Sequence, residues 1–134
     1  MSPFTRNFAI LALFLSLSQT ATCAPNTNVE IVQCNVGTYS EGDPFAISLA
    51  YVLAELEDAT PSRRGGYDFR NVSPYPNAFA YGHAACNRTL ASPDCAACLA
   101  AAKTSVLGAC AGRIGGRSVL YDCTVRYEQY PFDD

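Results

Sequence analysis

The spacing of the cysteines limits what this chain can fold into more than any other feature of its sequence. Seven cysteines occur in 134 residues, and all but Cys23 lie after residue 30. These six are Cys34, Cys86, Cys95, Cys98, Cys110 and Cys123. An even number of cysteines in a short exported chain predicts a disulfide framework, although six cysteines allow fifteen pairings and their spacing alone selects none.

Residues 1–23 are predicted to be a secretory signal peptide. A single cation, Arg6, precedes the apolar run FAILALFLSL, which is shorter than the about 20 residues that a membrane-spanning helix needs. Small residues follow at Ala21 and Cys23, where signal peptidase would cleave. We therefore expect a secreted, extracellular protein with no membrane anchor and with six cysteines left.

Zinc is the competing interpretation of Cys95 and Cys98, which stand at the spacing of zinc ligands. A structural zinc site needs a second pair of ligands, and the sequence has no other C-x-x-C, while its single histidine, His83, lies in another segment. A redox role also lacks the preceding βαβ pattern that gives a C-x-x-C its meaning. We expect disulfides, no metal and no cofactor.

The charge of the chain argues against a nucleic-acid partner. After loss of the signal peptide, eight Lys and Arg face twelve Asp and Glu, so the net charge is 8 − 12 = −4. Proteins that bind nucleic acids carry basic patches instead.

Two helices are predicted from their N-terminal signals. The first begins at Asp43-Pro44 and runs to about residue 58, and the second begins at Ser92-Pro93-Asp94. Helical periodicity predicts the buried residues of each helix. They are Phe45, Leu49, Val52, Leu53 and Leu56 in the first and Cys95, Cys98, Leu99, Ala102 and Val106 in the second.

Strands are predicted at residues 30–35, 67–72 and 79–86, with one long central strand at 117–128. In the long strand, alternation places Val119, Tyr121, Cys123, Val125 and Tyr127 on one face. The order of elements favours a single α+β domain at 28–132, with an antiparallel sheet of about five strands and two α-helices packed on one face.

Several motifs resemble the plant ginkbilobin-like family, known for salt stress response, antifungal and cysteine-rich secretory proteins. The most specific is the C-x8-C-x2-C spacing that begins at Cys86, after the segment AYGHAAC. The others are Cys34-Asn35, Gly66-Tyr67-Asp68-Phe69, Gly115-Gly116-Arg117 and Arg126-Tyr127-Glu128. The resemblance covers about residues 28–132. It implies three disulfides, which are Cys34–Cys110, Cys86–Cys95 and Cys98–Cys123.

The resemblance also implies a mannose-binding site formed by Asn35, Arg117 and Glu128. A carboxylate, a guanidinium and an amide together supply the acceptors and donors that vicinal sugar hydroxyls need. Without the resemblance, the same residues would be read as a cross-strand ion pair and a turn residue. With it, we expect a lectin of the apoplast that binds mannose or fungal cell-wall mannan and has an antifungal, defensive role.

Other functions have less support in the sequence. No nucleophile can be paired with His83, which is predicted to be a packed or hydrogen-bonded side chain, and no glycosidase pattern surrounds the carboxylates Asp122 and Glu128. We therefore expect no enzyme. The main alternative is an apoplastic protein-interaction or signalling module with a cell-surface receptor ectodomain or a peptide as partner. A hydrolase inhibitor is a third alternative, with Arg63-Arg64 or Tyr75-Pro76 as its exposed loop.

Two N-glycosylation sequons remain in the mature chain, at Asn71 and Asn87. A glycan at either position would lie on the surface.

Overall fold

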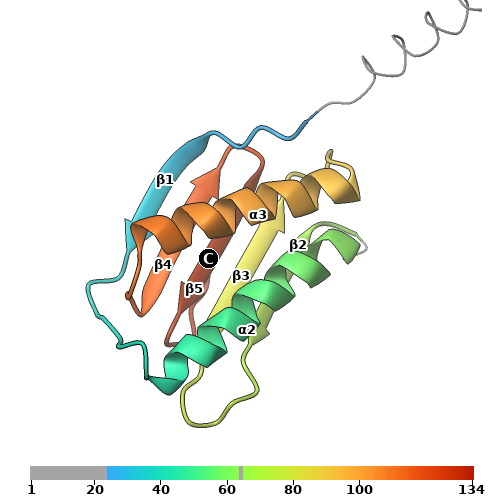
Figure 1. Ribbon diagram of the computed structural model, residues 1–134. Coiled ribbons are helices and arrows are strands. Elements are labelled where there is room, and N and C mark those ends of the chain that lie inside the picture. The colour runs from blue at the N-terminus through green and yellow to red at the C-terminus, as the bar shows by residue number, and fades with distance from the viewer. Residues whose placement is uncertain (1–23, 64) are drawn as a thin grey trace, which may run out of the picture.

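The computed structural model describes residues 24–63 and 65–134, so the predicted signal peptide lies outside the described residues. Two long helices cover one face of a five-stranded antiparallel sheet, which confirms the predicted α+β fold (Figure 1). The sheet order is β1-β4-β5-β3-β2. The strands are β1 (Val29–Cys34), β2 (Asp68–Val72), β3 (Tyr81–Cys86), β4 (Gly115–Leu120) and β5 (Cys123–Glu128), and the helices are α2 (Pro44–Ala59), η1 (Thr60–Ser62) and α3 (Ser92–Ala109).

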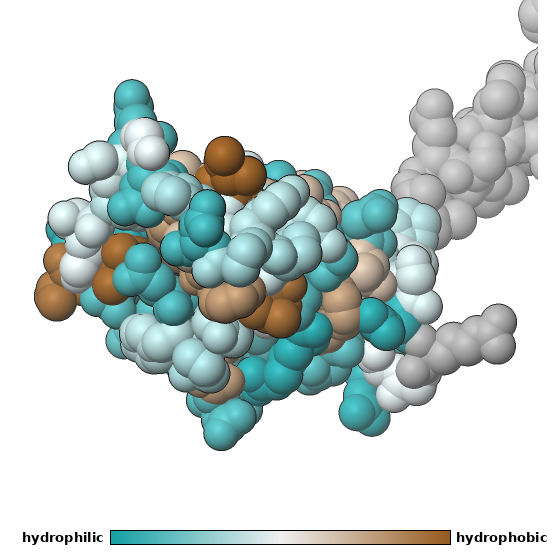
Figure 2. Space-filling model, turned by 90° about the horizontal axis from the view of Figure 1, so that it is seen from below, coloured by the Kyte–Doolittle hydropathy of each residue, from teal (hydrophilic) through white to brown (hydrophobic). Residues whose placement is uncertain are grey.

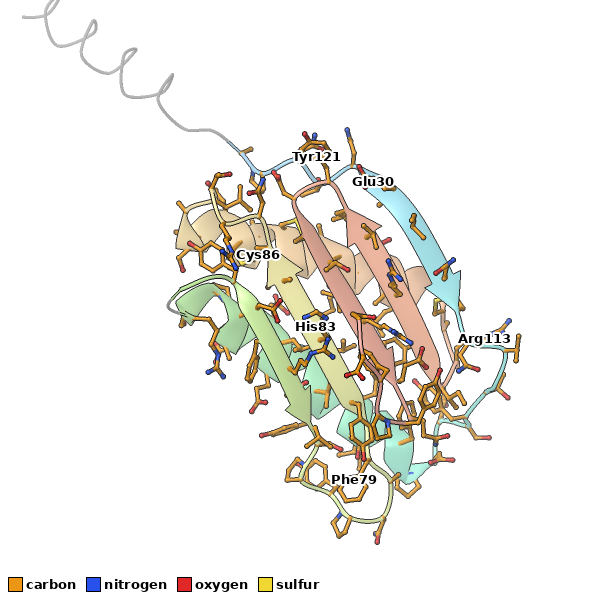
Figure 3. All side chains as sticks on the ribbon, turned by 180° about the vertical axis from the view of Figure 1, so that it is seen from behind. Glu30, Phe79, His83, Cys86, Arg113 and Tyr121 are labelled. Carbon is orange, nitrogen blue, oxygen red and sulfur yellow. A yellow bond between two sulfur atoms is a disulfide. The ribbon has the colours of Figure 1, made fainter. Side chains whose placement is uncertain are left out.

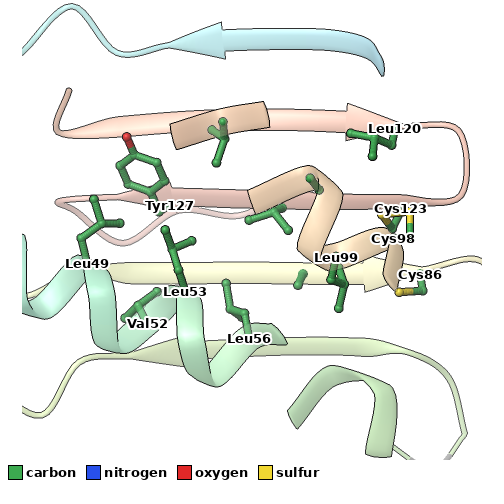
Figure 4. Close-up of a cluster of buried hydrophobic side chains, with 14 of the residues drawn as sticks. Leu49, Val52, Leu53, Leu56, Cys86, Cys98, Leu99, Leu120, Cys123 and Tyr127 are labelled. Atoms are coloured by element: carbon green, nitrogen blue, oxygen red, sulfur yellow. A yellow bond between two sulfur atoms is a disulfide. The ribbon is translucent and has the colours of Figure 1, made fainter. Parts of the chain in front are cut away.

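Both long helices begin where the sequence predicts. The Asp43 side chain accepts a hydrogen bond of 2.9 Å from the Phe45 N–H and so caps α2, while Pro44 occupies the first helical position. All ten residues predicted for the two apolar faces are buried. They meet the inner face of the sheet, where Figure 4 shows Leu49 and Leu53 beside Tyr127 of β5, and Leu99 near Cys98 and Cys86.

Three disulfides tie α3 and the residue after it to three strands. The bridges are Cys34–Cys110 to β1, Cys86–Cys95 to β3 and Cys98–Cys123 to β5. These are the pairs that the family resemblance implies. Because each bridge joins α3 to a different strand, the helix is fastened across most of the width of the sheet.

The prediction of one long strand at 117–128 is wrong, because this segment is the hairpin of β4 and β5. Tyr121 and Asp122 form the turn, and the inward face changes from even to odd residue numbers across it. Leu120 is therefore buried, whereas Tyr121, predicted to share a face with Val125 and Tyr127, is 63% exposed while those two are buried. The Asp122 side chain fixes the turn by accepting hydrogen bonds from the Asn26 N–H and the Asn87 amide, at 2.7 and 3.2 Å.

The opposite face of the sheet carries no helix among the described residues. Figure 3 views this outer face and shows His83 of β3 near its middle and Arg113 beside the end of β1. Segment 129–134 follows β5 and lies against this face, since its last residue contacts side chains of β3 and β5. The outer face therefore presents polar side chains that are not needed for the core.

Candidate functional site

Glu128 is a buried carboxylate at the end of β5, only 6% exposed. Gly115 of β4 lies directly opposite in the β4–β5 register. A Cβ atom at Gly115 would overlap the Glu128 carboxylate, so glycine at this position provides the space that the carboxylate occupies. Two side chains donate to it: the Asn35 amide to Oε2 at 3.3 Å and Arg126 Nη2 to Oε1 at 3.4 Å.

Asn35 follows β1 directly and is held on both sides. Its backbone N–H donates to the Gly115 carbonyl, and its side-chain Oδ1 accepts from the Gly37 N–H, both at 2.9 Å. With the oxygen so engaged, the amide NH2 group is directed to Glu128. The adjoining Cys34–Cys110 bridge fixes this end of β1 against α3.

Arg117 lies on β4, opposite Gln33 of β1 and Arg126 of β5. Among the described residues, no hydrogen bond or ion pair engages its side chain. Arg126, in contrast, is bound to Glu128 and to Asp134. The guanidinium N–H groups of Arg117 are thus free to donate hydrogen bonds to a ligand.

The three residues implied by the family resemblance surround one hollow on the outer face, with a volume of about 240 Å³. The complete lining is Gln33, Cys34, Asn35, Arg117, Arg126, Glu128 and Tyr130. A hollow of this size suits a small polar ligand such as one sugar ring. The lining offers carboxylate and amide oxygens as acceptors, and guanidinium and amide groups as donors.

Sequence reasoning did not identify Arg126, Tyr130 and Gln33 as parts of this site. Arg126 could have been found, because it stands two residues before Glu128 and side chains two apart on a strand share a face. Tyr130 lies beyond the strand, and its position depends on the path of the following chain.

His83 is buried at 7% exposure between two carboxylates, in agreement with its predicted hydrogen-bonded role. Its Nε2 lies 2.9 Å from Asp68 Oδ1, and its Nδ1 lies 3.0 Å from Asp134 Oδ2. Both ring nitrogens are therefore occupied by carboxylates rather than directed at a nucleophile.

Asp122 and Glu128 stand at opposite ends of β5. With a rise of about 3.3 Å per residue they are about 20 Å apart, and the carboxylates of glycosidases are separated by about 5–10 Å. They cannot act as a catalytic pair.

The two sequons differ in their surroundings. The Asn71 amide donates to the Val52 carbonyl and to Glu55 Oε1, at 3.1 and 3.0 Å, and is therefore turned towards α2. Asn87 is exposed after β3; its amide donates to Asp122 Oδ1 at 3.2 Å, and its Oδ1 accepts from the Thr89 hydroxyl at 3.0 Å. Glycosylation stays a prediction, with Asn87 the more accessible position.

The described residues contain no group of three or more His, Cys, Asp or Glu placed to hold a metal ion. Within the same residues, no helix has the length and apolar character to cross a membrane.

Comparisons with solved structures identify the fold. The tandem DUF26 ectodomain of the Arabidopsis thaliana cysteine-rich receptor-like protein PDLP5 matches with a TM-score of 0.70 at 21% identity, covering 78% of this chain and 51% of that one. The corresponding ectodomain of PDLP8 matches with a TM-score of 0.64 at 24% identity, over 78% and 45%. This chain spans about half of each ectodomain, and at these identities the likeness concerns the fold alone.

Sequence comparisons identify the family. Antifungal protein ginkbilobin-like protein 1 of Picea sitchensis is 35% identical over 133 residues, which cover 97% of this chain and 98% of that protein. Antifungal protein ginkbilobin-2 of Ginkgo biloba is 33% identical, over 98% and 95%. Residues 32–130 match the family described as salt stress response/antifungal. The chain therefore belongs to this family and is similar along nearly its whole length to the antifungal ginkbilobin-like proteins.

Proposed function

We propose that this protein is a secreted, non-enzymatic lectin that binds mannose or fungal cell-wall mannan and contributes to antifungal defence. One observation carries the proposal: Asn35, Arg117 and Glu128 line a single hollow, although Asn35 and Glu128 are 93 residues apart in the sequence. These are the positions at which the family resemblance implies mannose contacts.

The chemistry of the hollow supports a sugar ligand. Glu128 can accept from hydroxyl groups, and Arg117 has free donors for hydroxyl oxygens. The face of the molecule seen in Figure 2 gives no competing apolar site, since its strongly hydrophobic residues stand in separate spots among hydrophilic ones. Because the hollow is shallow and small, we expect weak affinity for a monosaccharide and tighter binding to multivalent mannan.

Secretion and defence rest on different support. Disulfides persist in oxidising compartments, and the described residues form three. Cysteine-rich repeat secretory protein 55 of Arabidopsis thaliana is 31% identical to this chain over 112 residues. Several relatives from Picea and Ginkgo are called antifungal proteins. Together with the predicted signal peptide, these names favour an apoplastic defence protein.

The test is calorimetric titration of the oxidised mature protein with mannose and mannan, and with glucose as the C2 epimer of mannose. Asn35→Ala, Arg117→Ala and Glu128→Gln should each abolish or strongly weaken mannose binding. Arg88→Ala is the matched control, because Arg88 is an exposed arginine that does not line the hollow. Absence of mannose binding by the parent protein, with its disulfides intact, would refute the proposal.

A protein-interaction or signalling module is the second candidate. The observation that favours it is the fold likeness to ectodomains of cysteine-rich receptor-like proteins. This candidate predicts binding to a receptor ectodomain that survives Arg117→Ala, together with no binding to mannan. The same titrations therefore separate the two functions.

A further inference from the structure

The segment after β5, residues 129–134, forms a strap across the outer face of the sheet. The Phe132 ring packs against the Arg126 guanidinium, with 4.1 Å between the guanidinium carbon and the ring centroid. Arg70 of β2 donates from Nη1 to the Phe132 carbonyl at 3.1 Å. The strap is thus attached to β5 at the centre of the sheet and to β2 at its edge.

Asp134 is the main polar anchor of the strap. Its Oδ1 accepts a hydrogen bond from Arg126 Nη1, and its Oδ2 lies 3.0 Å from His83 Nδ1. Both partners are largely shielded from water: the side chain of Arg126 is 20% exposed and that of His83 is 9% exposed. Ion pairs that are shielded from water in this way are screened less than surface pairs.

These contacts continue into the candidate sugar hollow. Arg126 bonds to Asp134 through Nη1 and to Glu128 through Nη2, and its flat face is covered by Phe132. Glu128 in turn accepts from Asn35. An arginine side chain loses rotamer entropy when it is held in one conformation, and fixing it before a ligand arrives removes this cost from binding.

We propose that the strap completes the sugar site, with Arg126 as a fourth polar contact, Tyr130 as an apolar wall, and Asp134 as the positioning residue that holds Arg126 in the hollow. The inference rests on the proposed lectin function. Tyr130 lines the hollow and is 46% exposed, so its ring can receive the C–H face of a pyranose. The ligand class is a mannoside that reaches beyond the triad to the strap.

The pH dependence of the strap follows from the surroundings of Asp134. Burial alone would raise the pKa of Asp134, but hydrogen bonds from His83 and Arg126 outweigh it and hold this pKa below its ordinary value. The lowered pKa means that the stabilisation is present above pH about 4 and is lost as the pH falls through the folded-state value. The charged or titratable groups near Asp134 are His83 and Arg126 in direct contact, Arg70 at its backbone carbonyl, and Asp68 and Glu128 behind them.

The first experiment compares mannan affinity of the parent protein with Asp134→Asn and Asp133→Asn. Asp133 is exposed and carries the same charge one residue earlier, which makes it a matched control. We expect Asp134→Asn to weaken binding by about threefold to tenfold and Asp133→Asn to leave it unchanged. As the pH falls below about 4, the affinity advantage of the parent over Asp134→Asn should decrease.

A double-mutant cycle separates positioning from a general structural effect. Arg126→Gln should weaken binding at least as much as Asp134→Asn, and adding Asp134→Asn to Arg126→Gln should cause no further loss. Nuclear magnetic resonance of the Arg126 Nε–H group, recorded without ligand, reports the mobility of this side chain. The side chain should be rigid in the parent and in Asp133→Asn and mobile in Asp134→Asn.

The outcomes distinguish this inference from the proposed function. Mannan binding that is equal in the Asp134→Asn and Asp133→Asn proteins, fully additive effects in the cycle, or an equally mobile Arg126 in the parent would overturn the inference alone. No mannan binding by the parent would overturn the proposed function and the sugar site that the strap completes.

Discussion

A methyl group added at Gly115 tests the site without changing any residue that would contact the sugar. In Gly115→Ala, the new Cβ would overlap Glu128 Oε2 and lie 2.8 Å from Oε1, closer than Cβ atoms approach oxygen in folded proteins. Gly115 has no positive φ, so alanine can adopt its backbone conformation. The carboxylate, at the end of a flexible side chain, must therefore move while the strands stay in place.

The expected loss follows from the distances around Glu128. Its bonds to Asn35 and Arg126, at 3.3 and 3.4 Å, are already at the long limit for hydrogen bonds, and a displaced carboxylate loses both. A hydrogen bond to a charged group contributes about 1.5–3 kcal/mol, so losing its sugar contact should weaken mannose binding roughly tenfold to hundredfold. The fold should lose about 1 kcal/mol, a decrease in Tm of about 4–8 °C.

Titration calorimetry and thermal unfolding measure the two effects separately. Gly108→Ala in α3 is the matched control, because a Cβ there meets no atom within 4 Å. It should leave mannose affinity unchanged and raise stability by up to about 1 kcal/mol, as expected for Gly→Ala in a helix. Unchanged mannose affinity in Gly115→Ala would refute the assignment of Glu128 as a sugar contact.

Two further predictions concern stability. The Cys34–Cys110 bridge has a sequence separation of 76 residues and Cys86–Cys95 one of 9, so loop entropy gives about 4.5 and 2.6 kcal/mol respectively. Replacing each pair by alanine should reproduce this order in denaturant unfolding, and the reverse order would contradict it. Burial raises the pKa of Tyr127 to about 12, so absorbance titration should detect its ionisation only near that pH. Because its pKa is raised on folding, Tyr127 contributes stability below pH about 10 that is lost as the pH rises towards 12, and Tyr127→Phe should abolish this loss.

Local signals explain why the helices could be predicted residue by residue. A cap at Asp43, a proline at the first helical position and apolar residues at helical spacing all concern neighbours within a few turns. The buried face of α3 was likewise predicted from apolar residues at helical spacing within the helix itself. No long-range information was needed for either element.

The hairpin was missed because its turn lacks the usual chemistry. Two-residue hairpin loops favour Asn-Gly or Gly, whereas here the residues are Tyr121 and Asp122. Tyr121 continued an apparent alternation from Val119 to Tyr127, so an unbroken strand fitted the pattern better than two short ones. What fixes the turn is tertiary: Asp122 accepts a hydrogen bond from the Asn26 N–H, 96 residues earlier.

The hairpin also determines whether the candidate site can exist. On a single strand, Arg117 and Glu128 would be about 36 Å apart, at about 3.3 Å per residue, and could not contact one ligand. Folded back, β4 places Arg117 opposite Arg126, two residues from Glu128. The three residues that the family resemblance implies therefore lie near one another, whereas the strand predicted from alternation would have separated Arg117 from Glu128.

Assembly of the hollow depends on contacts that sequence patterns do not record. Asn35 is held beside Gly115 by a backbone hydrogen bond and by the adjoining Cys34–Cys110 bridge, and Arg126 is held by Asp134 of the strap. The hollow thus draws on β1, β4, β5 and the strap, none of which could form it alone. A site built this way follows from the oxidised fold as a whole, and loosening either the bridge or the strap should weaken sugar binding before the core of the sheet unfolds.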